Sequence, residues 1–497
     1  MYHSPLLTTE LTTVRTWTMH NSCLCNHVNA LIGRCGKCVP LANTEAVLQL
    51  LWPELEQLSV QVGWHPPVEY SEIYKSLDAK KRAGYMRAEQ NLINRGHVVT
   101  LNDARITMFV KLEGLPFKHD KVNPDCRAIQ FRTKEYTLLL ASYIRRGEHA
   151  TYKARDVWCP GPHFAKNKNP RMRAADLREL FDMGFKHVCE FDASRFDAHV
   201  GVPLNKLEAK YITSVSGGDM LHELMEMQQD NHGTFRCRTD LGEAKVKYRS
   251  RGGRMSGDAN TAYGNCLIMA SMLAAFGRSL GHRFAFYCDG DDSVFFHDGP
   301  VLGDGHIKKF FREFGMTMVI ENRPLKFEHI GFCQARPVQL NGYWTMVRDP
   351  FKILSKITVS HKLRDPKGRA SYVRTSAMGE LSLLRGCPVV QPFLMHLIKT
   401  LESKMSSRSK SKYNKVALAE NWRLRNWLPR DWRDAKALQI TPENRKSFED
   451  SWGVPIEQQI SFEDQISRWS IDMLTTTPGQ GVDVDRWEYP WKLDEMQ

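Results

Sequence analysis

Several signatures of familiar chemistries are missing from this sequence. It has no G-x-x-x-x-G-K-[ST] run, which excludes a P-loop motor, and neither G-x-S-x-G nor H-E-x-x-H occurs. No internal repeat is visible. The longest apolar stretch runs from Cys266 to Phe276. A bilayer-crossing helix needs about 20 apolar residues, so no transmembrane segment is predicted.

A secretion signal and an ordered set of cysteine pairs are missing as well. The opening residues MYHSPLLTTE lack the basic-then-apolar order of a signal peptide, and most of the 12 cysteines are scattered singly. Reduced thiols in a cytosolic compartment are therefore expected. Four cysteines do cluster near the start, but only Cys35 and Cys38 have zinc-ligand spacing, whereas Cys23 and Cys25 are a poor chelating pair. A structural zinc ion is not expected.

What the chain has is length and positive charge. Its 497 residues are 42% apolar, enough for two to four domains or one multi-lobed enzyme, and its net charge is +13. A polyanionic partner fits this charge, although a merely basic soluble protein fits it equally well. The Ser- and Lys-rich tract from Ser403 to Lys415 predicts an exposed loop.

Three carboxylates crowd the stretch YCDGDDSVFF, at Asp289, Asp291 and Asp292. The flanking runs Phe284–Cys288 and Ser293–His297 predict two strands, and the Asp-Gly between them is a strong hairpin signal. The acids are therefore expected at a hairpin tip between half-buried strands. Asp289, which precedes the glycine, is interpreted as a turn residue that asparagine would suit equally.

A second acidic pair follows another predicted strand. Residues His187–Phe191 alternate as a buried strand does, Asp192 stands at its end, and Asp197 follows beyond a turn. Alone, such residues more often cap a helix or a turn. Placed beside the hairpin tip, however, Asp192 would join a carboxylate cluster whose repulsion and desolvation cost several kcal/mol.

Divalent cations would remove that cost. Ligands that offer only oxygen suit Mg²⁺ or Mn²⁺, and two such ions about 3.5–4 Å apart serve in-line phosphoryl displacement. A metal-free pair of acids, as in glycoside hydrolysis, is the alternative, and the rest of the cleft must decide between them.

The stretch RGGRMSGDANTAYGNC leads from a glycine-rich turn into a predicted helix. Ser256 lies in the turn, and Thr261 and Asn265 share one helix face. The residues beyond Asn265 are apolar nearly all round, which predicts a buried helix. Small polar groups facing a carboxylate cluster suit recognition of a sugar hydroxyl, whereas helix capping explains them if the motif stands alone.

Basic residues precede these motifs in two runs. Arg127 adjoins the apolar pair Ala128-Ile129 and is expected on a strand, where its fork-shaped side chain can bind phosphate. The rest of the first run is Lys111, Lys118, Lys121 and Arg132. The second run is Lys166, Lys168, Arg171 and Arg173, for which a solvated face is an equally good explanation.

The order of these motifs resembles that of viral RNA-dependent RNA polymerases, and their wording is similar to the tombusvirus family. The resemblance is carried, over roughly residues 20 to 340, by MHNSCLCNHVNALIGR, the RAI block, FDASRFDAHV, GGRMSGDANTAYGNC, GDDSV and GFCQARPV. Asp289 departs from the pattern, in which asparagine is commoner. Ala259 and Tyr263 stand where bulkier Met and Leu are expected. These departures touch turn geometry and packing.

The resemblance implies an α+β fold shaped as a closed right hand, with an antiparallel palm sheet and helix-rich fingers and thumb. The expected divisions are an N-terminal segment with fingertips at 1–100, fingers at 101–185, a palm at 186–345 with a fingers insertion near 205–250, and a thumb with a tail at 346–497.

The resemblance also implies roles for individual residues. Asp192 and Asp291 would be the main ligands of two Mg²⁺ or Mn²⁺ ions, and Asp292 a secondary ligand. The ribose 2′-hydroxyl would be read by Asp197, Ser256, Thr261 and Asn265. The triphosphate would be held by Lys111, Lys118, Arg127 and Arg132. The primer grip would be Phe332, Cys333 and Gln334, and Lys326 would be the general acid, with Arg323 as the neighbour able to replace it.

The implied activity is template-directed RNA synthesis from rNTPs for a positive-strand RNA virus, with primer-independent initiation. The implied partners are template and product RNA, rNTPs and a membrane-anchoring viral replication protein, at membrane-associated sites in the host cytoplasm. A reverse transcriptase-like polymerase and a non-catalytic basic RNA-binding protein are the alternatives. Gly290 argues against the first, since reverse transcriptases usually carry an aromatic-x-D-D turn where this chain has Gly290.

The last notable feature of the sequence is a group of three tryptophans among arginines, Trp422, Trp427 and Trp432. They would either stack on RNA or form a buried helical core, and the core is favoured because large aromatic side chains are mostly buried.

Overall fold

The computed structural model describes residues 7–8, 17–18, 23–36, 39–111, 115–116, 126–239, 242–357, 366–407, 413–420, 422–468 and 472–473. The chain divides into two compact units. The central unit comprises Ser22–Lys111 and Asp125–Cys333, and the C-terminal unit comprises Met1–Asn21, Leu112–Pro124 and Gln334–Gln497.

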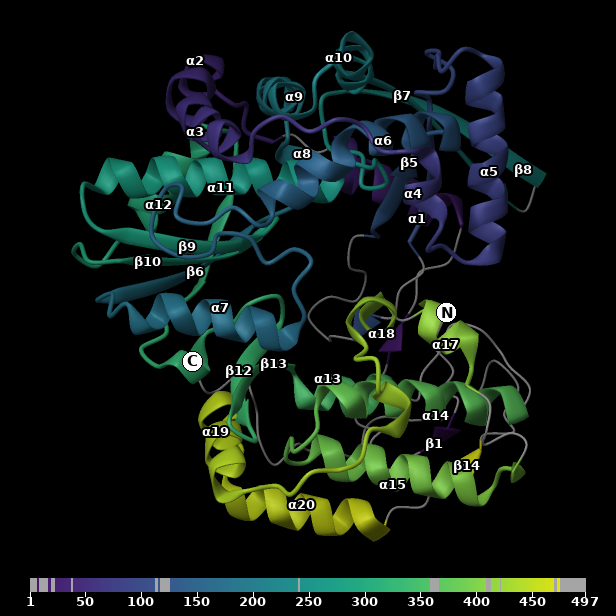
Figure 1. Cartoon of the computed structure of the whole chain (residues 1–497), viewed down its shortest axis with the longest axis vertical. Coiled ribbons are helices and arrows are strands. Elements are labelled where there is room, and N and C mark those ends of the chain that lie inside the picture. Colours follow the sequence, from purple (N-terminus) through teal and green to yellow (C-terminus); the bar gives the residue numbers. More distant parts are fainter. Residues whose placement is uncertain are drawn as a thin grey trace. The chain divides into compact units, whose positions relative to one another are not determined.

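A four-stranded antiparallel sheet forms the middle of the central unit. Its strands are ordered β11 (Met318–Asn322), β6 (His187–Ala193), β10 (Asp292–His297) and β9 (Phe284–Asp289). Figure 1 shows helix α11 (Thr261–Leu280) and helix α7 (Pro170–Asp182) on opposite sides of this sheet. Because both faces are covered, β9 and β10 read as nearly continuous apolar runs.

Helix α11 is buried almost all round, as the sequence predicted. Phe276 packs against Phe295 of β10, with ring centroids 5.4 Å apart, and equally closely against Phe311 of α12 (Asp304–Arg312). At Gly277 an added Cβ would lie 2.3 Å from the Phe284 ring, so only glycine lets the helix approach β9 this closely. None of the helices among the described residues has the length and apolar character that crossing a membrane requires.

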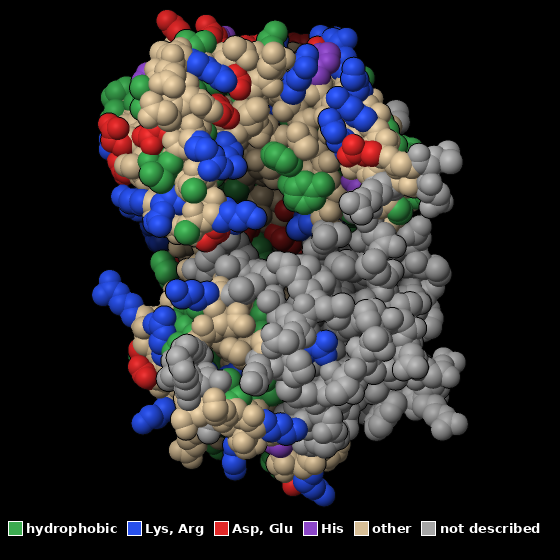
Figure 2. All heavy atoms as spheres, turned by 90° about the vertical axis from the view of Figure 1, so that its right-hand side faces the viewer, with side chains coloured by type: hydrophobic (Ala, Val, Ile, Leu, Met, Phe, Trp, Pro, Cys, Tyr) green, Lys and Arg blue, Asp and Glu red, His purple; other side chains and the backbone are tan. Residues whose placement is uncertain are grey.

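A second four-stranded sheet lies in the same unit, in the order β5 (Ala128–Phe131), β3 (Ile106–Val110), β7 (Asp230–Thr239) and β8 (Gly242–Arg251). Only the β3–β7 pair is parallel. Residues of α1 (Leu24–Leu31) cover one face, where Ala30 joins Met108, Val110 and Phe235 in a small core. The described exposed residues of β8 alternate with its covered ones and include Lys245, Lys247 and Arg251. Figure 2 shows lysine and arginine side chains spread over the surface on the side where β8 lies in Figure 1.

The remaining elements of the central unit are mainly helices. They are η2 (Ile32–Gly36), α2 (Thr44–Ala46), η3 (Val47–Leu51), α3 (Trp52–Val62), α4 (Tyr70–Tyr74), α5 (Ala79–Asn94), α6 (Lys134–Thr151), α8 (Phe196–His199), α9 (Val202–Ser216), α10 (Asp219–Glu226) and η4 (Phe327–His329).

The C-terminal unit begins with a hairpin, β12 (Ala335–Leu340) and β13 (Tyr343–Arg348), and continues with helices. These are α13 (Pro350–Lys356), α14 (Pro366–Leu383), α15 (Val390–Ser403), α17 (Lys415–Glu420), α18 (Trp422–Trp427), η5 (Trp432–Asp434), α19 (Pro442–Trp452) and α20 (Ile456–Arg468). Short pairs join β1 (Leu7–Thr8) to β14 (Asp472–Met473) and β2 (Trp17–Thr18) to β4 (Leu115–Pro116). Its core is apolar and includes Val373, Leu381, Phe393 and Leu397.

Three further predictions fall partly outside the described residues. Trp432 is buried and meets the Tyr413 ring edge-on at 5.0 Å, as a core residue does, while the Trp422 side chain lies outside the described residues. Cys35 contacts the side chain of Gln130, and Cys38 lies outside the described residues. Of the Ser- and Lys-rich tract, residues 408–412 lie outside the described part of the chain as well.

Candidate active site

Three predicted ligands lie at one end of the first sheet. Asp192 is the penultimate residue of β6, Asp292 is the first residue of β10, and Asp291 is in the turn between β9 and β10. Strands β6 and β10 pair antiparallel with Phe191 opposite Ser293, so Asp192 and Asp292 follow at the same end. Gly290 adopts a φ of 78°, a left-handed conformation that favours glycine, and so makes the tight turn possible.

The carboxylates at this end raise one another's pKa values. Burial, followed by the charges of Asp291 and Glu321, raises the pKa of Asp192 to about 6. Burial, followed by the charges of Asp291 and Asp192, raises the pKa of Asp292 to about 7. Among the described residues, neither carboxylate has an ion-pair partner on the chain. The negative charge is therefore left for a ligand to neutralise.

The donor set fits a divalent cation. Asp192, Asp291 and Asp292 offer oxygen only, which suits Mg²⁺ or Mn²⁺ better than zinc. Within the described part of the chain, no three His, Cys, Asp or Glu side chains gather into a ready-made metal cluster. Mg²⁺ is usually held by one or two carboxylates together with substrate phosphates, so an incomplete protein site of this kind agrees with its chemistry.

Asp289 has a different environment, and the predicted turn role does not describe the contacts of its side chain. Its carboxylate pairs with Lys166 Nζ through Oδ1, and with Arg173 Nη2 at 2.7 Å through Oδ2. The side chains of Asp289 and Arg173 are only 8% and 7% exposed. Burial raises the pKa of Asp289, but the charges of Lys166 and Arg173 outweigh this effect and leave it below the usual value.

Backbone contacts bring these two cations to Asp289. Residues next to Lys166 run alongside β9, where Cys288 N–H donates to His163 O at 2.9 Å and Ala165 N–H donates to Cys288 O at 3.0 Å. Asn169 then caps α7, which places Arg173 in its first turn. For Lys166 and Arg173, neither a solvated face nor a triphosphate site describes the environment. The short apolar segment Phe164–Ala165 was the sequence signal that could have indicated burial.

Two of the residues expected to recognise the ribose, Asp197 and Asn265, are hydrogen-bonded to each other. Asn265 Nδ2 donates to Asp197 Oδ1 at 2.9 Å, and Arg254 Nε donates to Asn265 Oδ1 at 3.0 Å. The amide of Asn265 is therefore held in one orientation. The charge of Asp197 also raises the pKa of Asp291, after the larger effect of burial, which places this pair near the acidic turn.

Ser256 and Thr261 make contacts with the backbone. Ser256 Oγ donates to Ala128 O at 2.9 Å, and Thr261 Oγ1 donates to Met255 O at 2.8 Å. The turn packs tightly on β5, since an added Cβ at Gly257 would lie 2.5 Å from Gln130 O. In this structure both hydroxyls therefore fix the turn, while their predicted role toward ribose stays a prediction.

A buried polar network behind Asn265 was not anticipated. Arg254 pairs with Glu208, and Asn260 Nδ2 donates to Glu208 Oε1 at 2.7 Å and to Gln228 Oε1 at 3.0 Å. Arg254, Glu208 and Asn260 are all buried. Their charges and amides satisfy one another. The only sequence signal was a run of polar residues directly before a fully apolar helix.

Two residues of the first basic run lie together. Lys111 N–H donates to Arg127 O at 2.7 Å, next to the paired residues Val110 and Ala128, so both residues flank the same end of the β3–β5 pair. Arg127 is exposed and Lys111 is half-buried. Lys118 lies outside the described residues. The predicted triphosphate role of all three stays a prediction.

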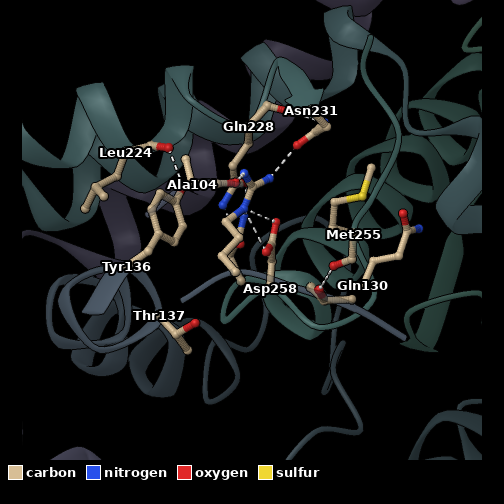
Figure 3. A network of polar contacts seen from close by, with 12 residues as sticks. Ala104, Gln130, Tyr136, Thr137, Leu224, Gln228, Asn231, Met255 and Asp258 are labelled. Atoms are coloured by element: carbon tan, nitrogen blue, oxygen red, sulfur yellow. Dashed lines mark hydrogen bonds and ion pairs between the residues drawn. The ribbon is translucent and has the colours of Figure 1, made fainter. Parts of the chain in front are cut away.

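Arg132 is not placed to bind a triphosphate, and that prediction is wrong. Its side chain is 1% exposed, and Nε donates to Asp258 Oδ1 at 2.9 Å and to Oδ2 at 3.1 Å. The two remaining nitrogens donate to Ala104 O at 2.6 Å and Asn231 Oδ1 at 2.5 Å (Figure 3). Arg132 instead links the end of β5 to the turn before α11.

The remaining predicted residues are near the end of the central unit. Lys326 is exposed and precedes η4, whereas Arg323 is held by Asp304 Oδ1 at 2.7 Å and Leu302 O at 2.8 Å. Phe332 is buried against Tyr287, with ring centroids 5.2 Å apart. Cys333 and Gln334 both have a φ in the left-handed region, 52° and 58°. The side chain of Phe332 is therefore packed inside the protein, so any grip on a primer must come from other atoms of this turn.

Comparison of the sequence with known proteins identifies a family. Residues 6–473 match the family of viral RNA-dependent RNA polymerases. The RNA-directed RNA polymerase of Tomato bushy stunt virus is 29% identical over 481 residues, which cover 94% of this chain and 56% of that protein. The enzyme of the same name from Melon necrotic spot virus is 32% identical over 351 residues, 70% of this chain and 44% of that protein. This chain thus spans about half the length of these relatives.

A solved structure shows the fold. The Sicinivirus 3Dpol RNA-dependent RNA polymerase superposes with a TM-score of 0.57 at 12% identity, covering 85% of this chain and 96% of that one. The predicted α+β right-hand polymerase fold with an antiparallel sheet is confirmed. The match over residues 6–473 covers more than half of the sequence, and the chain belongs to the viral RNA-dependent RNA polymerase family.

Proposed function

We propose that this chain synthesises RNA on an RNA template, transferring a nucleotidyl group from an rNTP to a 3′-hydroxyl. The observation that carries the proposal is the group Asp192, Asp291 and Asp292 at one sheet end, without cationic partners among the described residues. Asp197, which is hydrogen-bonded to Asn265, is close enough for its charge to raise the pKa of Asp291. Charge of this kind is suited to cations that accompany a nucleoside triphosphate.

In this proposal the carboxylates hold the ions and other residues bind the substrate. Asp192, Asp291 and Asp292 would hold two Mg²⁺ ions, which when bound would favour the deprotonated 3′-hydroxyl and stabilise charge on the phosphates. Arg127 and Lys111 would bind the triphosphate from the end of β3–β5. Lys326, exposed before η4, would donate a proton to the leaving pyrophosphate.

Discrimination for ribose would come from Asp197 and Asn265. Because Arg254 fixes the Oδ1 atom of Asn265 and its Nδ2 atom donates to Asp197 Oδ1, the second carboxylate oxygen of Asp197 can accept from a 2′-hydroxyl. A reverse transcriptase-like enzyme would instead exclude that hydroxyl. A dNTP preference would overturn this assignment.

The biological setting is also proposed, on the family membership. We infer that the chain serves replication of a positive-strand RNA virus genome, that initiation needs no primer, and that a membrane-anchoring viral protein brings it to membranes in the host cytoplasm. The division into fingers, palm and thumb at residues 101–185, 186–345 and 346–497 is proposed on the same basis.

The experiment is an rNTP incorporation assay on purified protein, with primed and unprimed templates and with Mg²⁺ or Mn²⁺. Synthesis by the parent and none by Asp291→Ala, with RNA binding retained by both, is expected. A non-catalytic RNA-binding protein would instead bind RNA and leave parent and variant equally inactive under all conditions.

A further inference from the structure

Within the described part of the chain, Asp289 is the one acid of the YCDGDDSVFF turn that has cationic partners. Its two oxygens meet Lys166 and Arg173, while among the described residues Asp291 and Asp292 have no ion-pair partner. We propose that Lys166, Asp289 and Arg173 form an ionic anchor that positions the Asp291–Asp292 turn for cation binding. None of the three touches the reacting atoms in this proposal, and all are positioning residues.

The anchor connects three separate parts of the central unit. Lys166 comes from the segment beside β9, Arg173 from the first turn of α7, and Asp289 from the end of β9. Arg173 is also fastened by Nε, which donates to Lys168 O at 3.1 Å. A turn held by cations from two separate segments, Arg173 buried and Lys166 half-buried, has little freedom to shift its next residues. The β9–β10 pairing, Asp289 opposite Asp292, passes this constraint directly to a predicted ligand.

The ionic anchor also contacts the turn that follows η4. Cys333 Sγ donates to Asp289 Oδ2 at 3.5 Å, and the Arg173 guanidinium carbon lies 6.0 Å from the centre of the Phe332 ring. Phe332 in turn packs against Tyr287 of β9. The predicted primer-grip turn and the metal-bearing turn therefore share Asp289 and Arg173 as supports.

Substitution by asparagine separates charge from shape at this position. Asp289→Asn keeps the size of the side chain but leaves Lys166 and Arg173 without a counter-charge in a buried place. Removal of a residue that orients metal ligands typically weakens metal affinity about 10- to 100-fold. A residue that serves only as a turn former would change neither metal affinity nor kinetics.

The test measures Mn²⁺ binding directly, by electron paramagnetic resonance of free Mn²⁺ titrated with purified full chain, together with thermal unfolding. Asp298→Asn is the matched control, because Asp298 follows the same hairpin at its other end and pairs with Arg283 at 2.7 Å. For Asp289→Asn, Mn²⁺ binding at least about tenfold weaker than that of parent and control is expected. Equal Mn²⁺ affinity in all three proteins would overturn the proposal.

A second set of variants keeps the test valid if Asp289→Asn does not fold. Arg173→Lys keeps the charge but loses the forked geometry, and Lys166→Met removes one cation. Both should weaken Mn²⁺ binding. If Lys166 acts only through Asp289, the double variant Lys166→Met/Asp289→Asn binds Mn²⁺ no more weakly than Asp289→Asn. Fully additive losses would show that Lys166 acts on the cation site by itself, and the anchor would be wrong.

The proposal rests on the proposed function only in taking Asp291 and Asp292 as cation ligands. A parent protein that binds Mn²⁺ but makes no RNA would refute the proposed function and leave the anchor to be judged by the variants. A parent that makes RNA while Asp289→Asn binds Mn²⁺ and synthesises RNA as the parent does would refute the anchor alone.

Discussion

Arg132 with Asp258 and Asp192 with Asp292 are two charged groups of the same unit in opposite circumstances. Arg132 and Asp258 are buried, and the chain supplies every partner of the guanidinium. Asp192 and Asp292 are half-buried, and within the described residues the chain supplies them no cation, so their pKa values rise to about 6 and about 7. Charged side chains that find their partners within the chain therefore stabilise the fold here. Acidic side chains that have no cationic partner among the described residues indicate a binding site for a ligand.

The largest effect is expected at the unsatisfied acids. Asp192→Ala should lower the rate of nucleotide incorporation at least about a thousandfold, roughly 4 kcal/mol of transition-state stabilisation, because a main cation ligand is lost. Asp292→Ala should cost less, since Asp292 is the secondary ligand. Single-turnover kinetics on a primed template measure both. A smaller loss for Asp192→Ala than for Asp292→Ala would reverse the assigned ranking.

Loss of the Arg132–Asp258 ion pair should lower the stability of the folded protein. Arg132→Met leaves Asp258 buried without a counter-charge and should lower the free energy of unfolding by about 3–5 kcal/mol, measured by denaturant titration. Arg127→Met is the matched control at the opposite end of the same strand, β5. Its unfolding should be that of the parent, while the KM for rNTPs rises about tenfold through loss of a charged phosphate contact. The comparison would be contradicted if Arg127→Met lowered the free energy of unfolding while Arg132→Met only raised the KM for rNTPs.

A smaller effect is expected for ribose selection. Asn265→Ala removes the group that orients Asp197, and the preference for rNTP over dNTP should fall by about tenfold, one lost hydrogen bond in the transition state. Competition between the two nucleotides on one template measures the ratio. An unchanged ratio together with a lower rate would show that Asn265 supports the fold and does not read the sugar.

A further effect is expected in the pH dependence of the metal-free protein. Because Asp292 binds a proton more tightly in the folded than in the unfolded state, its ionisation destabilises the fold as pH rises from about 4 towards 7. Asp292→Asn cannot ionise. The difference in melting temperature, variant minus parent, should therefore grow between pH 4 and pH 7, and Mg²⁺ should reduce it. A constant difference across this range would argue against the carboxylate repulsion.

The sequence was informative where a feature depends on neighbouring residues. The β9–β10 hairpin, the strand that carries Asp192 and the buried helix α11 were all predicted, because an Asp-Gly turn and apolar periodicity are local signals. Arg132 and Asp289 were misinterpreted for the opposite reason. Their partners Asp258, Lys166 and Arg173 are distant in sequence, and only the fold reveals that the charges cancel.

The environments of Arg132 and Asp289 were misinterpreted for one physical reason. In a basic run such as Lys166 to Arg173, composition alone does not distinguish a solvated side chain from one turned inward. The backbone pairing of Ala165 with Cys288 brings Lys166 to Asp289, and that pairing forms only in the folded chain.

The proposed catalytic role of Asp291 is tested most directly by incorporation of a single nucleotide on a defined RNA primer–template, by the parent and by Asp291→Asn, with RNA affinity measured alongside. We expect that the parent adds the complementary rNTP when Mg²⁺ or Mn²⁺ is present, and that Asp291→Asn binds the same RNA equally well but adds none. A parent that adds no nucleotide with either ion, or an Asp291→Asn protein that extends the primer at the parental rate, would contradict it.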